Sequence, residues 1–304
     1  MSSPPDDQYL FRGNETERHR LDNQYRVIQK CFDKGPVTLS GSLHEGRVNK
    51  VLDIAAGSLA WTMDVARSVE PSKVELYACD ISSDSFPHKS VIDMFGITTF
   101  IHDVTKPFPE GMRGQFDVVN MRLLLYALTE GEWKLALKNV HDVIKPGGHL
   151  YLFEFDAPWY PGEDVNPNAV ASWLPTLNKI LDKHAKAVGY IDNLTERLPK
   201  ILRDNSFTIK DQLVGPVPFG MAGKTCRSIN GASLAGDEDF MGGVTKLILR
   251  RVMIRALAGG YLEDEDGNPV TTEEGHLQLL ERFVKGFDVY GVLFKGIHVT
   301  AVRN

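Results

Sequence analysis

The segment Lys50–Leu59, K-V-L-D-I-A-A-G-S-L, is the part of this chain around which the rest is arranged. Its apolar residues Val51, Leu52 and Ile54 predict a short buried strand, and a helix is expected over residues 59–68. The small residues between the two predict a tight turn. A strand, a small-residue turn and a helix N-terminus together let a ligand approach bare backbone N–H groups. The segment therefore predicts a ligand site built on main chain.

The composition of the turn separates the kinds of ligand. Residues 55–59, A-A-G-S-L, lack the G-x-G-x-x-G spacing that brings a dinucleotide pyrophosphate against a helix N-terminus. They also lack the Lys-Ser/Thr pair that completes a phosphate-binding P-loop. What remains is the pattern D-x-A-x-G-S from Asp53 to Ser58, which suits a ligand with an amino group and no phosphate.

Strand-like and helix-like segments alternate after this turn. Further strands are expected at 74–79, 97–101, 116–121 and 149–155, helices at 86–95 and 130–144, and a sharp turn at K-P-G-G, residues 145–148. This alternation is typical of a doubly wound α/β sheet, which binds ligands at the C-terminal ends of its strands.

The flanking segments predict a cover for that sheet. A helix over 15–33 is expected to lie across the entrance. The second half predicts helices at 168–188, 194–204, 237–257 and 271–288, strands at 206–214 and 292–302, and a glycine-rich loop at 215–243. We expect one continuous fold: a tail and entrance helix (1–48), an α/β core (49–157), and a helical cap whose late strands add an antiparallel edge to the same sheet (158–304).

Composition limits the classes of function. The chain has 304 residues, 42% of them hydrophobic, and a net charge of −6, so nucleic-acid binding is not expected. No apolar run approaches the ~18 residues of a membrane span, and residues 1–15 do not resemble a secretion signal. Three scattered cysteines predict neither a disulfide framework nor a metal site. A cytoplasmic protein without membrane or metal is expected.

Four more motifs follow in a fixed order: Y-A-C-D-I (77–81), H-D-V-T-K-P-F-P (102–109), F-D-V-V-N-M-R-L-L-L-Y (116–126) and V-I-K-P-G-G-H-L-Y-L (143–152). With the first turn, this set resembles the Rossmann-like S-adenosylmethionine-dependent methyltransferases over roughly residues 25–156. G-S-L-A-W-T-M-D-V-A (57–66) and C-D-I-S (79–82) further resemble fungal methyltransferases of secondary metabolism, including a regulator-like group. The resemblance implies a methyltransferase with S-adenosylmethionine as cofactor.

The resemblance also implies roles for individual residues. Asp80 would accept hydrogen bonds from the two ribose hydroxyls. Asp103 would accept a hydrogen bond from the adenine amino group. Ile81 and Val104 would pack on the faces of the adenine ring. The methionine part and the sulfonium would lie against a third set: Tyr25, Asp53, Ala55, Gly57, Asn120, Met121 and Arg122.

The chain departs from the resembling family at two turn positions. The family usually has glycine where this chain has Ala55 and Leu59. The change at Ala55 is small. The bulky Leu59 is expected to shift or weaken cofactor binding at the helix start.

Methyl transfer from a sulfonium is an in-line displacement, so the protein mainly aligns the acceptor and excludes water. A general base is needed only for an acceptor that holds its proton tightly. The candidates are His102, Glu154 and Tyr126, although His102 would also suit a turn and Glu154 a buried structural role. Aromatic residues such as Trp159 and Phe219 in the cap predict a hydrophobic small-molecule acceptor.

Two other functions stay open from the sequence. One is a regulator that keeps the methyltransferase fold and acts through a protein partner. The other is a non-methylating enzyme of the pericyclase type that uses the pocket for shape and charge. A homodimer is equally left open.

Overall fold

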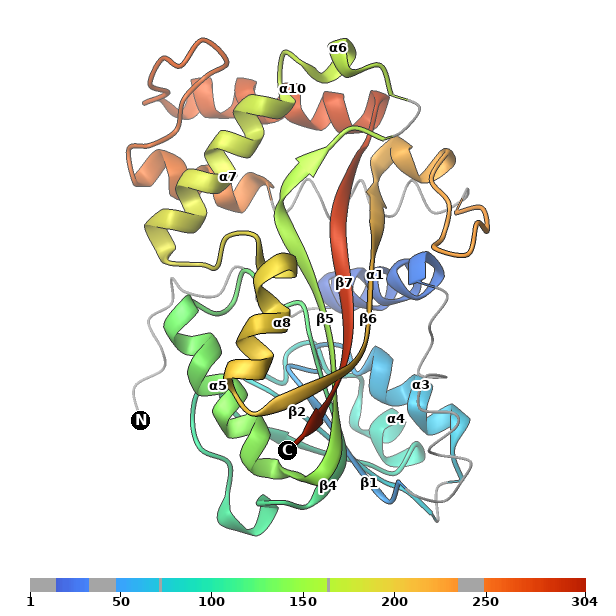
Figure 1. Cartoon of the computed structure of the whole chain (residues 1–304). Helices are drawn as coiled ribbons and strands as arrows, with labels where there is room; N and C mark the ends of the chain where they lie inside the picture. The colour runs from blue at the N-terminus through green and yellow to red at the C-terminus, as the bar shows by residue number, and fades with distance from the viewer. Residues whose placement is uncertain (1–14, 33–47, 71–72, 163–164, 235–248) are drawn as a thin grey trace.

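A computed structural model describes residues 15–32, 48–70, 73–162, 165–234 and 249–304 (Figure 1). The expected N-terminal tail and the segment 235–248, including the start of the helix expected at 237, lie outside the described residues. All descriptions below refer to the described ranges.

A seven-stranded sheet with the order β3-β2-β1-β4-β5-β7-β6 forms the centre of the fold. The first five strands run parallel to one another, and β7 pairs antiparallel with both β5 and β6. The strands are β1 (Lys50–Ile54), β2 (Glu75–Asp80), β3 (Ile97–Ile101), β4 (Phe116–Arg122), β5 (Ile144–Tyr160), β6 (Phe207–Phe219) and β7 (Val292–Arg303). The doubly wound sheet with an antiparallel C-terminal edge is confirmed.

Helices cover both faces of this sheet. Leu59, Trp61 and Val65 pack on one face in a core with Val51 of β1, whereas Trp133, Phe153 and Leu198 belong to the core on the other face. The helices are α1 (Glu15–Phe32), α3 (Ala60–Ser68), α4 (Lys89–Met94), α5 (Glu130–Val143), α6 (Pro167–Val170), α7 (Leu174–Val188), α8 (Leu194–Asp204) and α10 (Glu273–Val289), and residues 249–258 are also helical.

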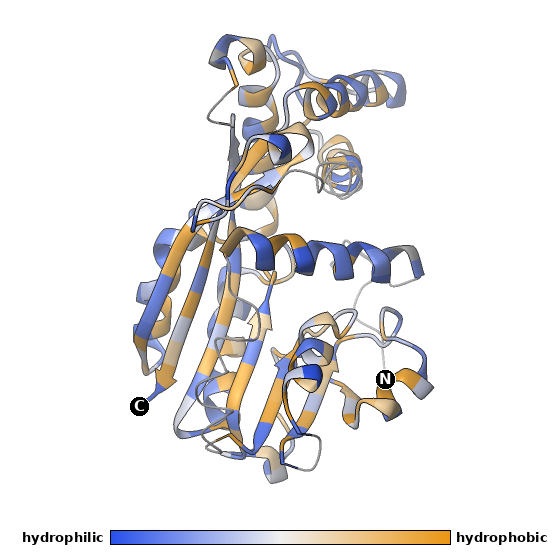
Figure 2. Ribbon diagram, turned by 90° about the vertical axis from the view of Figure 1, so that its right-hand side faces the viewer, coloured by the Kyte–Doolittle hydropathy of each residue, from blue (hydrophilic) through white to orange (hydrophobic). Residues whose placement is uncertain are grey.

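The three long strands β5, β6 and β7 extend past the parallel part of the sheet and connect it with a group of helices at the far end (Figures 1 and 2). Figure 1 shows α6, α7 and α10 in that group, and it shows α1 at the level between them and α3. The C-terminal ends of the parallel strands therefore face α1 and the distal helices.

Two expectations for the second half were wrong in detail. β6 continues to Phe219, into the segment expected to be a loop, because β7 supplies hydrogen-bond partners as far as Val292. Its Pro216 and Pro218 are tolerated because β6 is an edge strand, where one side of the backbone needs no partner. The helix expected at 168–188 is divided into α6 and α7, with a turn at 171–173 between them.

The sharp turn expected at residues 145–148 lies instead inside β5, which begins at Ile144. Gly147 keeps a positive φ of 77°, and the register between β4 and β5 shifts between Phe116 and Val118. The glycine pair therefore produces an irregularity within the strand pairing rather than ending it.

Candidate functional site

A cavity lies at the C-terminal ends of the parallel strands, where α1 and the long antiparallel strands meet. Its lining combines a polar part near the first turn with an apolar part on β5, β6 and β7. The lining residues are Arg20, Leu21, Gln24, Tyr25, Ala55, Ala56, Gly57, Ser58, Asp80, Arg122, Leu123, Leu124, Leu125, Tyr126, Ala127, Phe155, Trp159, Phe219 and Phe294. Five of the predicted cofactor and catalytic residues besides Asp80 are among them: Tyr25, Ala55, Gly57, Arg122 and Tyr126.

The turn after β1 holds three residues in the left-handed region. Ala55, Gly57 and Leu59 have φ values of 54°, 55° and 62°. A positive φ favours glycine at position 57, and a Cβ there would lie 3.0 Å from Cδ1 of Leu21, which would have to shift slightly. The main chain is therefore closely approached by α1 on the side that lines the cavity.

Leu59 does not disturb the cavity in the way the sequence suggested. Its side chain is fully buried in the core with Trp61 and Val65, and it does not contribute to the lining. Leu59 therefore does not crowd the cavity, and its expected effect on cofactor binding stays a prediction.

Asp80 connects β2 to this turn. Its Oδ2 accepts a hydrogen bond from the backbone N–H of Gly57 at 2.8 Å, and its Oδ1 accepts a longer one from the N–H of Ser82 at 3.3 Å. Burial raises the pKa of the carboxyl above its usual range, while these N–H groups act in the opposite direction. The carboxylate lines the cavity and keeps lone pairs for a further donor.

Asp53, Asn120 and Met121 lie beneath the cavity and do not line it. The carboxylate of Asp53 accepts hydrogen bonds from Thr62 Oγ1 at 2.6 Å and from Asn120 Nδ2 at 2.7 Å, and burial raises its pKa. Met121 is fully buried in the core. Asp53 and Asn120 thus satisfy each other's polar groups, and contact of Asp53, Asn120 and Met121 with the cofactor stays a prediction.

Arg122 and Tyr25 form a stacked pair at the edge of the cavity. The guanidinium carbon lies 4.7 Å from the ring centroid of Tyr25, whose hydroxyl donates to Oδ2 of Asp64 at 2.6 Å. The Nη1 atom of Arg122 is buried and has no hydrogen-bond partner among the described residues. Burial lowers the pKa of the guanidinium, and the nearby carboxylate of Asp53 opposes that shift. A buried cation with an unpaired donor suits an anionic group.

The three residues predicted near adenine do not line this cavity. Oδ1 of Asp103 accepts from the N–H and hydroxyl of Thr105, which forms a local turn. The carbonyl of Val104 accepts from Asn139 Nδ2, and Ile81 is exposed. Their contact with adenine stays a prediction.

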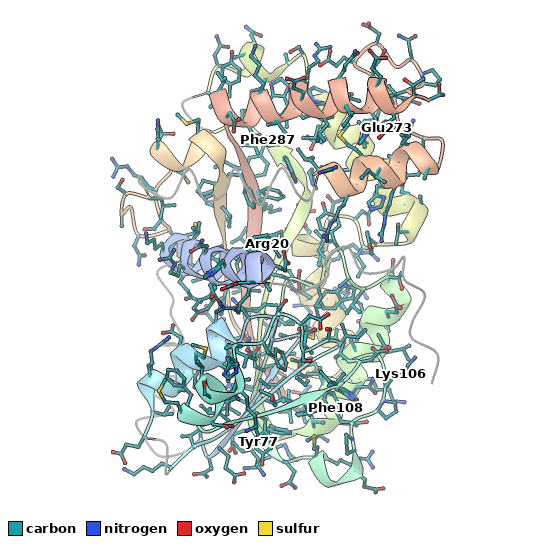
Figure 3. The ribbon with its side chains drawn as sticks, turned by 180° about the vertical axis from the view of Figure 1, so that it is seen from behind. Arg20, Tyr77, Lys106, Phe108, Glu273 and Phe287 are labelled. Atoms are coloured by element: carbon teal, nitrogen blue, oxygen red, sulfur yellow. The ribbon has the colours of Figure 1, made fainter. Side chains whose placement is uncertain are left out.

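The three catalytic candidates have different surroundings. His102 packs its ring 3.9 Å from that of Phe108, and its Nε2 faces the carbonyl of Lys106 at 3.2 Å. It does not line the cavity, and Figure 3 shows Phe108 well away from Arg20 on α1. The structure thus favours the alternative of a turn residue for His102.

Glu154 is fully buried and also absent from the lining. Its two oxygens accept hydrogen bonds from the backbone N–H groups of Leu124 at 2.7 Å and Leu125 at 3.2 Å. Burial raises the pKa of the carboxyl to about 8. Glu154 therefore fixes the backbone of the segment after β4, and that segment lines the cavity. A buried structural role accounts for Glu154 better than a role as a general base.

Tyr126 lines the cavity, and its hydroxyl is buried without a hydrogen-bond partner among the described residues. Burial raises the pKa of this phenol, so the hydroxyl keeps its proton at neutral pH.

Several lining residues were missed by the sequence analysis. Leu21 and Gln24 lie on the entrance helix, where their polarity and spacing carried no signal beyond amphipathicity. Phe155 and Phe294 lie on expected strands, about 140 positions apart in the chain, and only the antiparallel pairing of β5 and β7 brings them together.

Residues 28–208, more than half of the chain, match the ubiE/COQ5 methyltransferase family. The chain belongs to this family. The match covers every parallel strand, the turn after β1 and Asp80, so the polar part of the cavity lies within the family's own segment.

Three relatives of this ubiE/COQ5 family member are fungal proteins. It is 26% identical over 195 residues to methyltransferase grgD of a Penicillium species, covering 61% of this chain and 64% of that one. It is 30% identical to N-methyltransferase tcpN of Claviceps purpurea, covering 47% and 52%, and 23% identical to the secondary metabolism regulator LAE1 of Hypocrea atroviridis, covering 62% and 53%. The chain thus spans between about half and two thirds of the length of these relatives.

The described residues also bear on a membrane span and on a metal site. None of the helices in those ranges is both long and apolar enough to cross a membrane. The same ranges contain no cluster of three or more His, Cys, Asp or Glu side chains placed to hold a metal ion.

Proposed function

We propose that this chain transfers a methyl group from S-adenosylmethionine to a hydrophobic small molecule of fungal secondary metabolism. The observation that carries the proposal is the division of one cavity into a polar part, with Asp80 and Arg122, and an aromatic part on the antiparallel strands. Family membership and the names of the fungal relatives support the same function.

The residues of the polar part fit the cofactor. Asp80 offers carboxylate lone pairs to a diol, and the Nη1 donor of Arg122, which lacks a partner, suits the carboxylate of an amino acid. The positive φ of Gly57 and its closeness to Leu21 keep the turn free of side-chain bulk. We propose that these residues, with Tyr25 packed on Arg122, hold the methionine and ribose parts.

When bound, S-adenosylmethionine supplies a methyl group on a sulfonium whose leaving group is neutral. The chain's own task is then alignment of the acceptor and exclusion of water. Tyr126 is the candidate catalytic residue that lines the cavity, and its raised pKa makes it a donor that orients the acceptor.

Calorimetric titration with S-adenosylhomocysteine tests the cofactor part of this proposal. Asp80→Asn keeps an oxygen for the Gly57 N–H but removes the charge, so we expect affinity to fall by about 10-fold or more. Asp84→Asn, at an exposed carboxylate four positions further along, is the matched control and should leave affinity unchanged. Equal affinities for all three proteins would contradict the proposed cofactor site.

The similarity to LAE1 favours a second candidate, a methyltransferase-fold regulator of secondary metabolism that acts through a protein partner. Incubation with S-adenosylmethionine and a library of aromatic metabolites separates the two. Methylated product together with S-adenosylhomocysteine supports the enzyme, whereas cofactor binding without turnover of any library member supports the regulator.

A further inference from the structure

Five consecutive residues of the cavity lining, 123–127, follow directly after β4, and we call them the lining turn. Leu123 begins it with a left-handed φ of 61°, an angle that a residue with a Cβ keeps where its surroundings hold it. Within the turn, the N–H of Ala127 donates to the carbonyl of Leu124 at 2.9 Å. The shape of the cavity therefore depends on the contacts that hold the lining turn.

The strand β5 holds the first half of the lining turn. The N–H of Leu123 donates to the carbonyl of Phe153 at 3.0 Å. The carboxylate of Glu154 accepts the N–H groups of Leu124 and Leu125. Both partners are buried residues of the sheet, so this half of the turn is fixed from the core.

A residue of the cap holds the second half of the lining turn. Tyr190 lies between α7 and α8 (Figure 1), and its hydroxyl donates to the carbonyl of Tyr126 at 2.9 Å. The rings of these two tyrosines lie 5.8 Å apart in a T-shaped arrangement. The backbone of Tyr190 is fixed as well, because its N–H donates to the carbonyl of Ala185 and it forms a bridge with Thr129, the N-cap of α5. Tyr190 therefore connects the cap to the cavity lining.

Further groups of the cap surround Tyr190. Burial raises the pKa of its hydroxyl, and the guanidinium of Arg255 beside it opposes that rise. The ring of His184 lies 5.9 Å from the ring of Tyr190, and its Nδ1 lies 2.9 Å from the hydroxyl of Tyr261. The cluster thus holds two tyrosine hydroxyls with different partners: one bonds the lining turn, and the other bonds a histidine of α7.

We propose that Tyr190 is a positioning residue of the cavity, whose hydroxyl holds the lining turn in the shape that binds the cofactor. A partly buried carbonyl that loses its donor is costly, so the turn shifts or opens when this hydroxyl is absent. Asp80 and Arg122 line the same cavity, so a shifted turn changes the space in which they meet a ligand. The inference rests on the proposed function for the identity of that ligand.

Hydrogen–deuterium exchange followed by mass spectrometry tests whether Tyr190 holds the turn. Tyr190→Phe removes the hydroxyl and keeps the ring, so we expect the amides of residues 123–128 to exchange about tenfold faster. Tyr261→Phe is the matched control, because it removes the hydroxyl that bonds His184. It should leave the exchange of residues 123–128 unchanged, even where urea denaturation shows a similar loss of stability in both variants. Unchanged exchange in Tyr190→Phe, or equal acceleration in both variants, would overturn the inference.

Calorimetric titration with S-adenosylhomocysteine connects the turn to ligand binding. Tyr190→Phe should weaken the affinity about three- to tenfold, and Tyr261→Phe should leave it unchanged. Faster exchange in Tyr190→Phe with unchanged affinity would overturn the inference, because it would show a role in stability alone. Absence of binding to the folded wild type would overturn the proposed function, whereas the exchange of residues 123–128 would still support or overturn the hold of Tyr190 on the turn.

Discussion

The turn after β1 carries strain at the scale of single residues. Ala55 and Leu59 adopt left-handed backbone angles that favour glycine, and each costs roughly 1 kcal/mol relative to a residue without Cβ. For Leu59 the burial of a full side chain in the core offsets this cost. Ala55 is only half-buried and has little such compensation.

Ala55→Gly is therefore expected to stabilise the protein by about 0.5–1 kcal/mol, because it relieves the left-handed strain. Ala56→Gly is the control, since Ala56 is buried and its φ is not positive, and it should destabilise the protein by a similar amount. Urea denaturation measures both changes. A loss of stability in Ala55→Gly would show that the strain is not significant.

Glu154 predicts a pH dependence of stability. Burial raises its pKa in the folded protein to about 8, above the value of 4.5 for the free side chain. The folded state thus holds the proton more tightly, so this residue's contribution to stability decreases as the pH rises from about 4.5 to 8.

In Glu154→Gln this dependence disappears, together with one of the two backbone hydrogen bonds. The unfolding free energy of the wild type minus that of the variant should therefore fall by a few kcal/mol between pH 5 and 8. Taking the difference removes the contributions of Asp53 and Asp80, whose pKa values burial also raises. A difference that stays constant with pH would mean that Glu154 is ionised in the folded state.

At the scale of elements, the cavity depends on contacts between the cap and the long strands. The pairing of β5 with β7 is irregular before Trp159, and Asn178 of α7 accepts a hydrogen bond from the N–H of Trp159 at 2.9 Å. Asp156 of β5 holds the N-terminus of α8, because its Oδ1 accepts a hydrogen bond from the N–H of Thr195 at 2.7 Å. These side chains replace partners that neither a helix end nor a bulge can supply from its own backbone. The helices therefore support the strand β5, which carries part of the aromatic lining of the cavity.

Asn178→Ala should destabilise the protein by about 1–3 kcal/mol, because it leaves a backbone N–H and a carbonyl of Trp159 without partners. The tryptophan emission should also shift, since the two hydrogen bonds of Asn178 position the backbone of Trp159. Asn168→Ala, at an exposed asparagine of α6, is the control and should alter neither property. Chemical denaturation followed by fluorescence measures the stability and the emission. Identical behaviour of the two variants would show that Asn178 does not hold Trp159 in place.

At the scale of the whole molecule, the last strand joins the two halves. β7 lies between β5 and β6, so the C-terminal segment pairs with a strand of the parallel part and with the edge strand from the cap. Val299 and Ala301 of β7 are fully buried in the main core. The sheet is thus completed only when the end of the chain is in place.

A chain truncated after Gly291 should lose cooperative unfolding, because β6 would lose the strand it pairs with and β5 would lose its antiparallel partner. Removal of Asn304 alone is the control and should retain the transition, since β7 ends at Arg303. Thermal denaturation followed by circular dichroism measures this. A cooperative transition in the longer truncation would show that the parallel part folds without β7.

Much of the first half of the fold could be predicted because its signals are local. The five parallel strands and α5 follow apolar periodicity, and Asp80 and Gly57 were identified from short motifs. The later strand β6 was predicted too short, since the glycine and prolines at 215–218 resemble a loop until a partner strand is known. Glu154 and His102 were ambiguous for the same reason: the partners that satisfy them are not visible in the sequence.

The doubly wound sheet, the small-residue turn and the family could be recognised from the sequence alone, because they depend on residues close together in the chain. Three-dimensional packing was needed to show that Asp80 lines the cavity, whereas Asp53 is satisfied by Thr62 and Asn120 outside the lining. The tertiary structure also showed that the rings of Phe155 and Phe294 lie 5.6 Å apart in the lining of one cavity. The physical reason is that burial and hydrogen-bond pairing depend on distances in space, and an antiparallel strand from the end of the chain sets those distances here.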